Sequence, residues 1–407
     1  MAIIYCCLCL FVLLSRLKKL ASKSISKKRK EDPFIYRQPR PAPALIPTIA
    51  AGSAKWGLLV AKSYYLLYFA AIGCLLFFNI YLKQIGLSGV EIGWIGSLAP
   101  LIALVANPFW GAVADRWQIH RWVLATCTFV AGLVTLFFLQ VSSFWALMGL
   151  VMALSFFRTP INSIVDSTVM DMVKRTNSSY GQQRMWGTVG FVLATFGLGQ
   201  WLTPANLTII FWLHGALLGL ACTGLSLLLP VESGKQKVGI VQGLRVLTRQ
   251  HSYLSFLIAM TLLGMGLSAY IGFSGLHILA LGGTERQVGL AWAANALPEI
   301  PLMYFGARWF GRYSHKRLII IGFLGFALVW SLAALAPTPT LMIAVLPGIG
   351  ICFGFFWVAA VGYASEAAPP GLSATAQALM GAVQSGLGWS IGSVIAGYLW
   401  DHTSGHI

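Results

Sequence analysis

Ionisable side chains are rare within the long apolar stretches of this sequence, and four of them could do chemistry there. They are Glu299, which stands between two prolines, and Arg158, Asp166 and Arg184. If these stretches cross a membrane, each ionised group costs about 2.5–3.5 kcal/mol on insertion scales. Each group therefore needs a partner, a wet cavity or a neutral form, and these residues are the candidates for binding a solute or carrying a proton.

Glu299 is predicted to be the proton-coupling acid. Pro298 and Pro301 free backbone carbonyls and kink a helix, which favours a cavity around the carboxyl group between them. A desolvated carboxylate can take up a proton and release it when water or a cation reaches it. The alternative is a structural acid that is tied permanently to an arginine.

A polar stripe is predicted on one face of the helix that contains Arg158, Asn162 and Asp166, because these residues are four apart. Asp166 and Arg184 flank one short loop, so the hairpin should place them at similar depth, where a bidentate pair can form. We predict that Arg158, Asn162, Asp166 and Arg184 bind substrate. Two alternatives stay open: an inner-gate salt bridge between Asp166 and Arg184, and an Arg158 that only neutralises Glu299 or Asp166.

Eleven apolar spans are predicted to hold these residues. Their approximate bounds are 63–82, 91–114, 121–140, 145–172, 183–202, 206–230, 253–279, 287–310, 317–336, 340–364 and 374–399. Glycine spacings in the fifth span (Gly187, Gly190) and the eleventh (Gly388, Gly392) predict close helix packing there. The fold class is therefore an all-α membrane protein.

Composition supports that class and excludes several others. Hydrophobic residues make up 57% of the chain and charged residues 10%, so lipid must cover much of its surface. The net charge of +17 comes mostly from Lys and Arg on one side of the spans, which predicts a cytoplasmic N-terminus. We expect a multi-pass protein of the plasma membrane. The basic run Lys27 to Lys30 has no aromatic platform or reader module, so we expect no nucleic-acid partner.

Catalytic and metal-binding motifs are not found in the sequence. It has no phosphate-cradling glycine loop, zinc-binding histidine pair or serine nucleophile elbow. Of the seven cysteines, the four in apolar spans have neither disulfide nor metal-ligand spacing. We expect neither an enzyme nor a cofactor or metal.

Four segments are predicted along the chain: a basic leader and linker at 1–55, a six-helix bundle at 56–230, a cytoplasmic loop at 231–252 and a five-helix bundle at 253–407. A shift of 196 positions superposes five residues of the first bundle on the second: Gly86 on Gly282, Ser88 on Thr284, Gly93 on Gly289, Arg116 on Arg312 and Arg121 on Arg317. Two pseudo-symmetric bundles with a site between them are typical of alternating-access carriers. By this count a twelfth span is missing from the second half.

The sequence resembles the major facilitator superfamily over about residues 63–401. The loop after the second span carries the superfamily's signature turn at Gly111, Asp115, Arg116 and Arg121, with Gln118 where glycine is usual and His120 where a basic residue is usual. The resemblance implies that this turn is a latch with two states. Asp115 would pair with Arg116 or Arg121, and its negative charge would interact favourably with the positive N-terminal end of a nearby span. Gly111 would let the second span pack tightly.

A narrower resemblance is to the branch of lactose, nucleoside and phenylpropionate permeases. It rests on Asp166, on the run from Tyr180 to Phe191 and on the run from Leu297 to Pro301. In this branch the corresponding acid and arginine bind substrate hydroxyls, which implies the same role for Asp166 and Arg184. The tenth span departs from the branch, because Ile349 and Trp357 stand where a histidine is common.

A secondary transporter that moves a small polar solute (sugar, nucleoside or organic acid), as a monomer and by proton symport, is the function that these features predict. Its partners are the solute, protons and the lipid bilayer. One alternative is a proton-coupled efflux antiporter for amphiphilic compounds. Another is a non-transporting membrane protein built on the carrier fold.

Overall fold

The computed structural model describes residues 51–174, 176, 178–230, 250–302, 305, 313–368 and 373–403, and every regular element in these ranges is helical. Residues 1–50 of the predicted leader and linker (1–55), most of the loop at 231–252 and Arg312 lie outside the described residues.

The first half of the chain forms six helical spans. Their elements are α2 (Ala51–Cys74) with η1 (Leu75–Phe77) and α3 (Phe78–Gln84), α4 (Gly89–Trp117), α5 (His120–Phe137) with η2 (Phe138–Gln140), α6 (Phe144–Lys174), α7 (Tyr180–Trp201), and α8 (Ile209–Ala216) with η4 (Leu217–Cys222) and α9 (Thr223–Leu228). Each coincides with one of the six apolar spans predicted from the sequence. A short η3 turn (Pro204–Asn206) joins α7 to α8.

The second half follows the same plan. Its elements are α11 (His251–Ala280), α12 (Glu285–Ala296), α14 (His315–Ala334), α15 (Pro339–Val345) with α16 (Pro347–Ala367), and α17 (Ser373–Gly381) with η5 (Ala382–Gly388) and α18 (Trp389–His402). Nine helical stretches in the described part of the chain are long and apolar enough to cross a membrane. The remaining two predicted spans coincide with α7 and α12, and the count of eleven stays a prediction.

Residues that the sequence repeat superposes have the same structural role in both halves. Gly86 and Gly282 turn the chain in the left-handed region, with φ of 95° and 85°. Ser88 and Thr284 then cap α4 and α12 through capping boxes with Glu91 and Gln287. Local turn and cap chemistry therefore starts the second span of each half in the same way.

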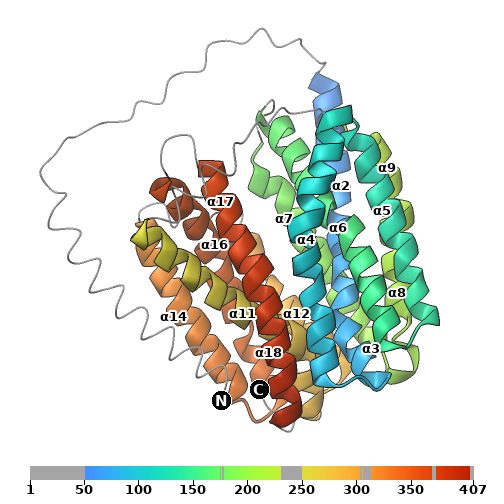
Figure 1. Cartoon of the computed structure of the whole chain (residues 1–407), viewed down its shortest axis with the longest axis vertical. Helices are drawn as coiled ribbons and strands as arrows, with labels where there is room; N and C mark the ends of the chain where they lie inside the picture. Colours follow the sequence, from blue (N-terminus) through green and yellow to red (C-terminus); the bar gives the residue numbers. More distant parts are fainter. Residues whose placement is uncertain are drawn as a thin grey trace, which may run out of the picture.

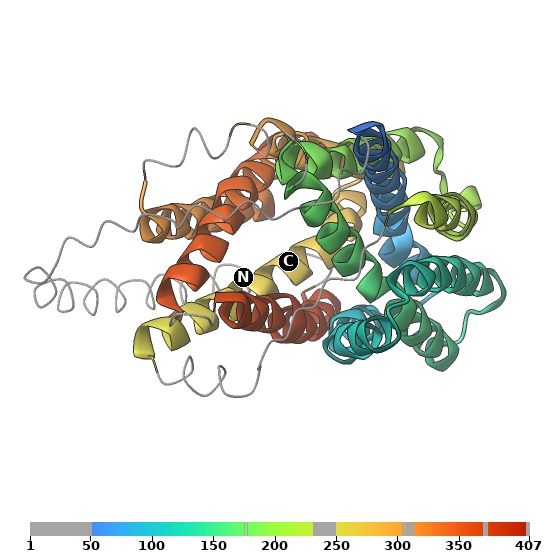
Figure 2. The ribbon, with the colours of Figure 1, turned by 90° about the horizontal axis from the view of Figure 1, so that it is seen from above.

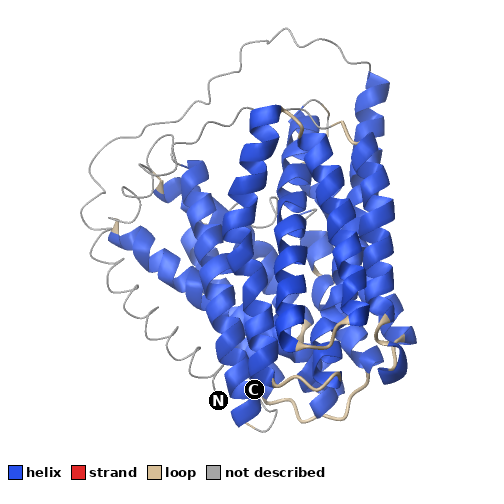
Figure 3. Cartoon of the chain, turned by 45° about the vertical axis from the view of Figure 1, so that its right-hand side comes forward, coloured by secondary structure: helices blue, strands red, loops and turns tan. Residues whose placement is uncertain are grey.

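The two halves form two bundles that lie side by side (Figure 1). Viewed along the helices, α11, α14, α16 and α18 lie on one side, and α2, α4, α5 and α8 on the other (Figure 2). The helices run roughly parallel to one long direction, and loops gather at the two ends (Figure 3). The predicted two-bundle fold is confirmed.

Two helix pairs join the bundles, α4 with α18 and α7 with α12, and repeat-related glycines lie at both crossings. Gly93 of α4 abuts the backbone of α18, where the Ser393 hydroxyl donates to the Gly93 carbonyl at 3.0 Å. Gly289 of α12 abuts α7, and a Cβ built on Gly199 would lie 2.9 Å from the Gly289 Cα. Small residues at these positions let the backbones of the two bundles touch.

These crossings lie toward the end of the molecule where α4 and α12 begin, which we call the Gly89 end. There the start of α4 and the last turns of α18 lie side by side, at the bottom of Figure 1. The Asn79 side chain also bridges the bundles, donating to the Gly272 carbonyl of α11 at 2.7 Å. At the opposite end, which we call the Asp115 end, the ribbons of the two halves diverge (Figure 1).

The predicted small-residue packing is confirmed in both helices. Gly190 of α7 lies directly against the Leu66 backbone of α2. Gly388 and Gly392 lie against the backbone of α11 at Thr261 and Met265. These close contacts fix the positions of α2 and α7, which carry part of the polar site.

Candidate functional site

The polar stripe of α6 is present as predicted. Arg158, Asn162 and Asp166 are each half-buried, and the Asn162 amide donates to Asp166 Oδ2 at 3.2 Å. The helix period of 3.6 residues places side chains four apart on one face, which explains this contact. One face of α6 therefore presents a base, an amide and an acid in succession.

Two tyrosines complete the surroundings of Asp166. The Tyr65 hydroxyl of α2 donates to Asp166 Oδ1 at 2.5 Å, and the Tyr180 hydroxyl at the start of α7 also hydrogen-bonds this carboxyl group. Neither tyrosine was predicted from the sequence to belong to the site. For Tyr65 the signal was the cluster Tyr64, Tyr65 and Tyr68, which is hard to distinguish from packing in a chain rich in aromatic residues. Tyr180 begins the run that carries the narrower resemblance.

Arg184 lies close to this acid but is held mainly by aromatic rings. Its guanidinium carbon lies 3.9 Å from the Phe69 ring centroid and 5.8 Å from that of Tyr65. Gly187, one turn along α7, leaves room for this stack, since a Cβ there would come within 2.7 Å of Phe69 and 2.8 Å of Arg184 Nη1. Among the described residues the predicted bidentate pair with Asp166 is not formed, because cation–π contact directs the guanidinium toward the rings.

Arg158 shares a polar region with Tyr68 and His214. Its charge acts on both side chains, and Tyr68 also interacts with the charges of Asp166 and Arg184. Tyr68 therefore links the charged groups of α6 and α7. Arg158 makes no ion pair with a carboxylate in the described ranges.

His214 of α8 is a buried polar group that was not predicted from the sequence. It is fully buried, and its Nδ1 lies 3.1 Å from the Ala71 carbonyl of α2. Because a carbonyl only accepts, Nδ1 carries the proton, and Nε2 has no hydrogen-bond partner among the described residues. A lone histidine in an apolar span gives little signal in a sequence, because only the fold shows that it faces Arg158.

Glu299 follows a break in its helix, as predicted from its two prolines. The α12 helix ends at Ala296, Leu297 and Pro298 form a turn, and the chain is helical again at Glu299. Gly350 of α16 packs against the Asn295 carbonyl and lies close to Pro298, which supports the break from the side. The tenth span thus contacts the region of Glu299 with apolar groups.

Glu299 is half-buried, and within the described ranges its carboxyl group interacts with a charge but with no hydrogen-bond donor. Its carboxyl group interacts electrostatically with Arg184, which belongs to the other bundle. Arg184 therefore interacts with a carboxyl group of each bundle, Asp166 in the first and Glu299 in the second. Glu299 has an opposite charge across the interface but no fixed hydrogen-bond partner. It can therefore change partners when the bundles move.

The signature turn differs from its prediction in two ways. Asp115 pairs with His120 at 2.8 Å, not with Arg116 or Arg121. The reason is that Gln118 ends α4 in the left-handed region, with φ of 55°, and the reversed chain returns His120 to the last turn of the helix. Gly111 was predicted to allow tight packing, but a Cβ there would meet nothing within 4 Å.

The second half contains a similar pair at the same end of the molecule. His315 begins α14, as His120 begins α5, and its Nδ1 lies 2.8 Å from Glu366 of α16. Both pairs connect helices of one bundle, so neither ties the two bundles together.

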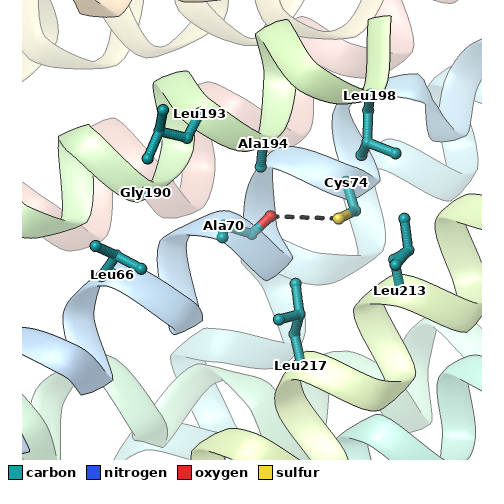
Figure 4. Close-up of a pocket in the computed structure, with 9 residues that line it drawn as sticks. All are labelled: Leu66, Ala70, Cys74, Gly190, Leu193, Ala194, Leu198, Leu213 and Leu217. Atoms are coloured by element: carbon teal, nitrogen blue, oxygen red, sulfur yellow. Dashed lines mark hydrogen bonds between the residues drawn. The ribbon is translucent and has the colours of Figure 1, made fainter. Parts of the chain in front are cut away.

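An apolar pocket of about 280 Å³ lies apart from these polar groups, between α2, α7 and α8 with η4 (Figure 4). Its lining includes Leu66, Leu198 and Leu213, and the Cys74 thiol in it donates to the Ala70 carbonyl at 3.3 Å. With no free polar group in its lining, this pocket does not fit a polar solute. The charged side chains between the bundles remain the candidate site.

Fold and site together define a membrane transporter of the major facilitator type. The profile of the MFS_1 like family matches residues 58–407, and the chain belongs to that family.

Relatives of the chain support the same class. The chain is 31% identical to a maltose permease of Geobacillus stearothermophilus, covering 85% of this chain and 90% of the relative. It is 27% identical to a probable 3-phenylpropionic acid transporter of Escherichia coli, covering 83% and 90%. The crystal structure of the nucleoside transporter NupG has the same fold, with a TM-score of 0.72 at 21% identity over 85% of this chain and 91% of that one. These relatives are transporters, not enzymes.

Proposed function

We propose that this protein carries a small polar solute (a sugar, nucleoside or organic acid) together with protons, by alternating access to a site between its bundles. The observation that carries this proposal is Glu299, a half-buried acid in a predicted span, which interacts with the charge of Arg184 across the interface and for which no hydrogen bond is found among the described residues. Keeping an ionisable group in hydrocarbon costs free energy, so its presence there indicates a function.

The two bundles contribute different groups to this mechanism. Asp166, Asn162, Tyr65 and Tyr180 form a hydrogen-bonding set that suits hydroxyl groups, and the fixed charge of Arg158 suits a carboxylate. Glu299 takes up a proton when the site is open to one side and releases it when Arg184 or water approaches from the other. The relatives with maltose, nucleoside and phenylpropionic acid in their names support this range of solutes.

The orientation follows from the charge distribution of the sequence. With the N-terminus in the cytoplasm, the Gly89 end faces outward and the Asp115 end faces inward. The contacts between bundles at the Gly89 end then describe a carrier that is closed toward the outside. The Asp115–His120 pair, with Arg116 and Arg121 beside it, forms a latch that holds the inner ends of α4 and α5 together in this state.

Transport in proteoliposomes tests the proton step. A panel of maltose, nucleosides and phenylpropionate identifies a solute whose accumulation depends on an imposed proton gradient and stops with an uncoupler. Glu299→Gln should then abolish accumulation while solute exchange continues, because glutamine copies the protonated shape but cannot release the proton. Glu285→Gln, a change at the surface end of α12, is the matched control and should accumulate solute normally.

Three outcomes contradict the proposal. Accumulation that survives in Glu299→Gln excludes this residue as the coupling acid. Loss of exchange as well indicates a structural acid. Solute movement against the expected direction, out of vesicles in exchange for protons, indicates the efflux antiporter.

A further inference from the structure

Asp401 connects the two bundles at the Gly89 end. Its side chain, on the last turn of α18, accepts hydrogen bonds from two backbone N–H groups of α4: Gly89 donates to Oδ1 at 2.7 Å and Val90 donates to Oδ2 at 2.9 Å. Both N–H groups belong to the first turn of a helix, which has no partners for them within the helix. An acid of the second bundle therefore satisfies the free end of a helix in the first bundle.

The charge of Asp401 favours α4 and disfavours its own helix. A negative charge is stabilising near a helix N-terminus and destabilising near a C-terminus. Asp401 lies at the C-terminal end of α18, which runs from Trp389 to His402, so it gains nothing from the dipole of that helix. Its favourable interaction is with the N-terminus of α4, and it exists only while the two bundles are in contact at this end.

The backbone is shaped to allow this contact. A Cβ built on Gly89 would come within 2.7 Å of Asp401 Oδ1 and 2.8 Å of both the Gly397 carbonyl and Trp400. Gly89 therefore leaves the space that the carboxylate occupies. Any other residue at this position would push α18 away from α4.

The repeat-related helix start in the second half has no such cap in the described ranges. Thr284 and Gln287 cap α12 from within, as Ser88 and Glu91 cap α4, and no carboxylate of the first bundle is bonded there. The α4–α18 crossing thus carries a charge-assisted contact in addition to its glycine packing. The α7–α12 crossing is held by packing.

We propose that Asp401 is a positioning residue for transport: it latches the Gly89 end shut by capping α4 across the interface, and it must release α4 each time that end opens. This inference rests on the proposed alternating access but not on the solute or the coupling ion. Removing the latch should move the conformational equilibrium toward the state that is open at the Gly89 end. Because hydrogen bonds to a charged group are among the stronger ones, the expected shift is about tenfold.

Distances between spin labels test the latch directly. Labels at Ser142→Cys in the first bundle and Thr340→Cys in the second, both exposed at the Gly89 end, report whether this end is open in the full chain without native cysteines. Asp401→Asn should increase the population with the longer label-to-label distance about tenfold over wild type. Asp401→Ala, which removes both acceptors, should increase it more. A second label pair at the Asp115 end should show the complementary shortening.

Glu91→Gln is the matched control, because Glu91 caps the same end of α4 from within its own bundle. It should leave the distances unchanged. Unchanged distances in both Asp401 variants, or an equal shift in Glu91→Gln, would overturn the latch. Accumulation assays on the same variants separate the two proposals: if Glu299→Gln abolishes accumulation while Asp401 variants keep wild-type distances, proton coupling stands and the latch is wrong.

Discussion

The two bundles share a fold but differ in how they hold their membrane charges. In the first bundle Asp166 accepts hydrogen bonds from Tyr65, Asn162 and Tyr180, and Arg184 rests on the Phe69 ring. In the second bundle Glu299 has no hydrogen-bond partner among the described residues and sits beside a break in its helix. A carboxylate held by several donors keeps its geometry, whereas one without donors can change partners. This difference supports the proposal that the first bundle binds the solute and the second carries the proton.

Removing the Asp166 carboxylate, which accepts several hydrogen bonds, should have the largest effect on stability. Asp166→Ala leaves the hydroxyls of Tyr65 and Tyr180 and the Asn162 amide without their acceptor, and leaves Glu299 as the carboxylate that interacts with Arg184. Breaking a buried charged network by removing one partner costs about 3–5 kcal/mol. Thermal unfolding in detergent should show a clear drop in Tm, with loss of both accumulation and exchange. Glu299→Gln, by contrast, should unfold close to the wild-type temperature; an equal drop in both would refute the comparison.

Adding one methyl group beneath Arg184 should weaken solute binding without unfolding the protein. In Gly187→Ala the new Cβ meets Phe69 and Arg184 within 3 Å, so the guanidinium must leave its stack. Overpacking of this kind costs about 1–3 kcal/mol, and we expect roughly tenfold weaker binding of the transported solute by calorimetry. Gly197→Ala on the same helix, where a Cβ meets nothing within 4 Å, is the control and should bind normally. Equal binding by both variants would show that the position of Arg184 is unimportant.

Removing one hydroxyl should have a smaller effect. Tyr65→Phe deletes one of the donors to Asp166 but keeps the ring against which Arg184 lies. A hydrogen bond to a charged group contributes about 1.5–3 kcal/mol, part of which the remaining donors retain. We expect a several-fold increase in KM for uptake with little change in accumulation ratio. Tyr398→Phe, at an exposed tyrosine of α18, should leave KM unchanged.

The histidine–carboxylate pairs at the Asp115 end should give the smallest change in stability. The side chains of Asp115 and Glu366 are 52% and 63% exposed, and such pairs typically contribute about 0.2–1 kcal/mol. Asp115→Asn and Glu366→Gln should therefore shift Tm by a few degrees at most. If the two pairs are equivalent latches, both variants should change the transport rate to a similar extent; a change in only one would show that the halves differ here as well.

Much of the fold could be predicted from residue type and spacing. Nine of the eleven predicted apolar spans coincide with helices long and apolar enough to cross a membrane, because length and hydropathy suffice to identify a helix that must satisfy its backbone in lipid. The repeat of Gly86, Ser88 and Gly93 at Gly282, Thr284 and Gly289 indicated two equivalent halves, since turn, cap and packing requirements are local. The break at Pro298 followed from proline chemistry alone.

The partners of the polar residues depended on the tertiary structure. The sequence placed Arg184 near Asp166 but could not show that Phe69 of α2 would hold the guanidinium, nor that Asp115 would pair with His120. His214 and Asp401 gave no signal, because their significance lies in Arg158 and the α4 N-terminus, which are distant in sequence. The sequence by itself determined which segments cross the membrane and which charges they carry, since both follow from the transfer free energy of individual side chains. Only the tertiary structure decided which charges meet, because that depends on how helices from distant parts of the chain pack together.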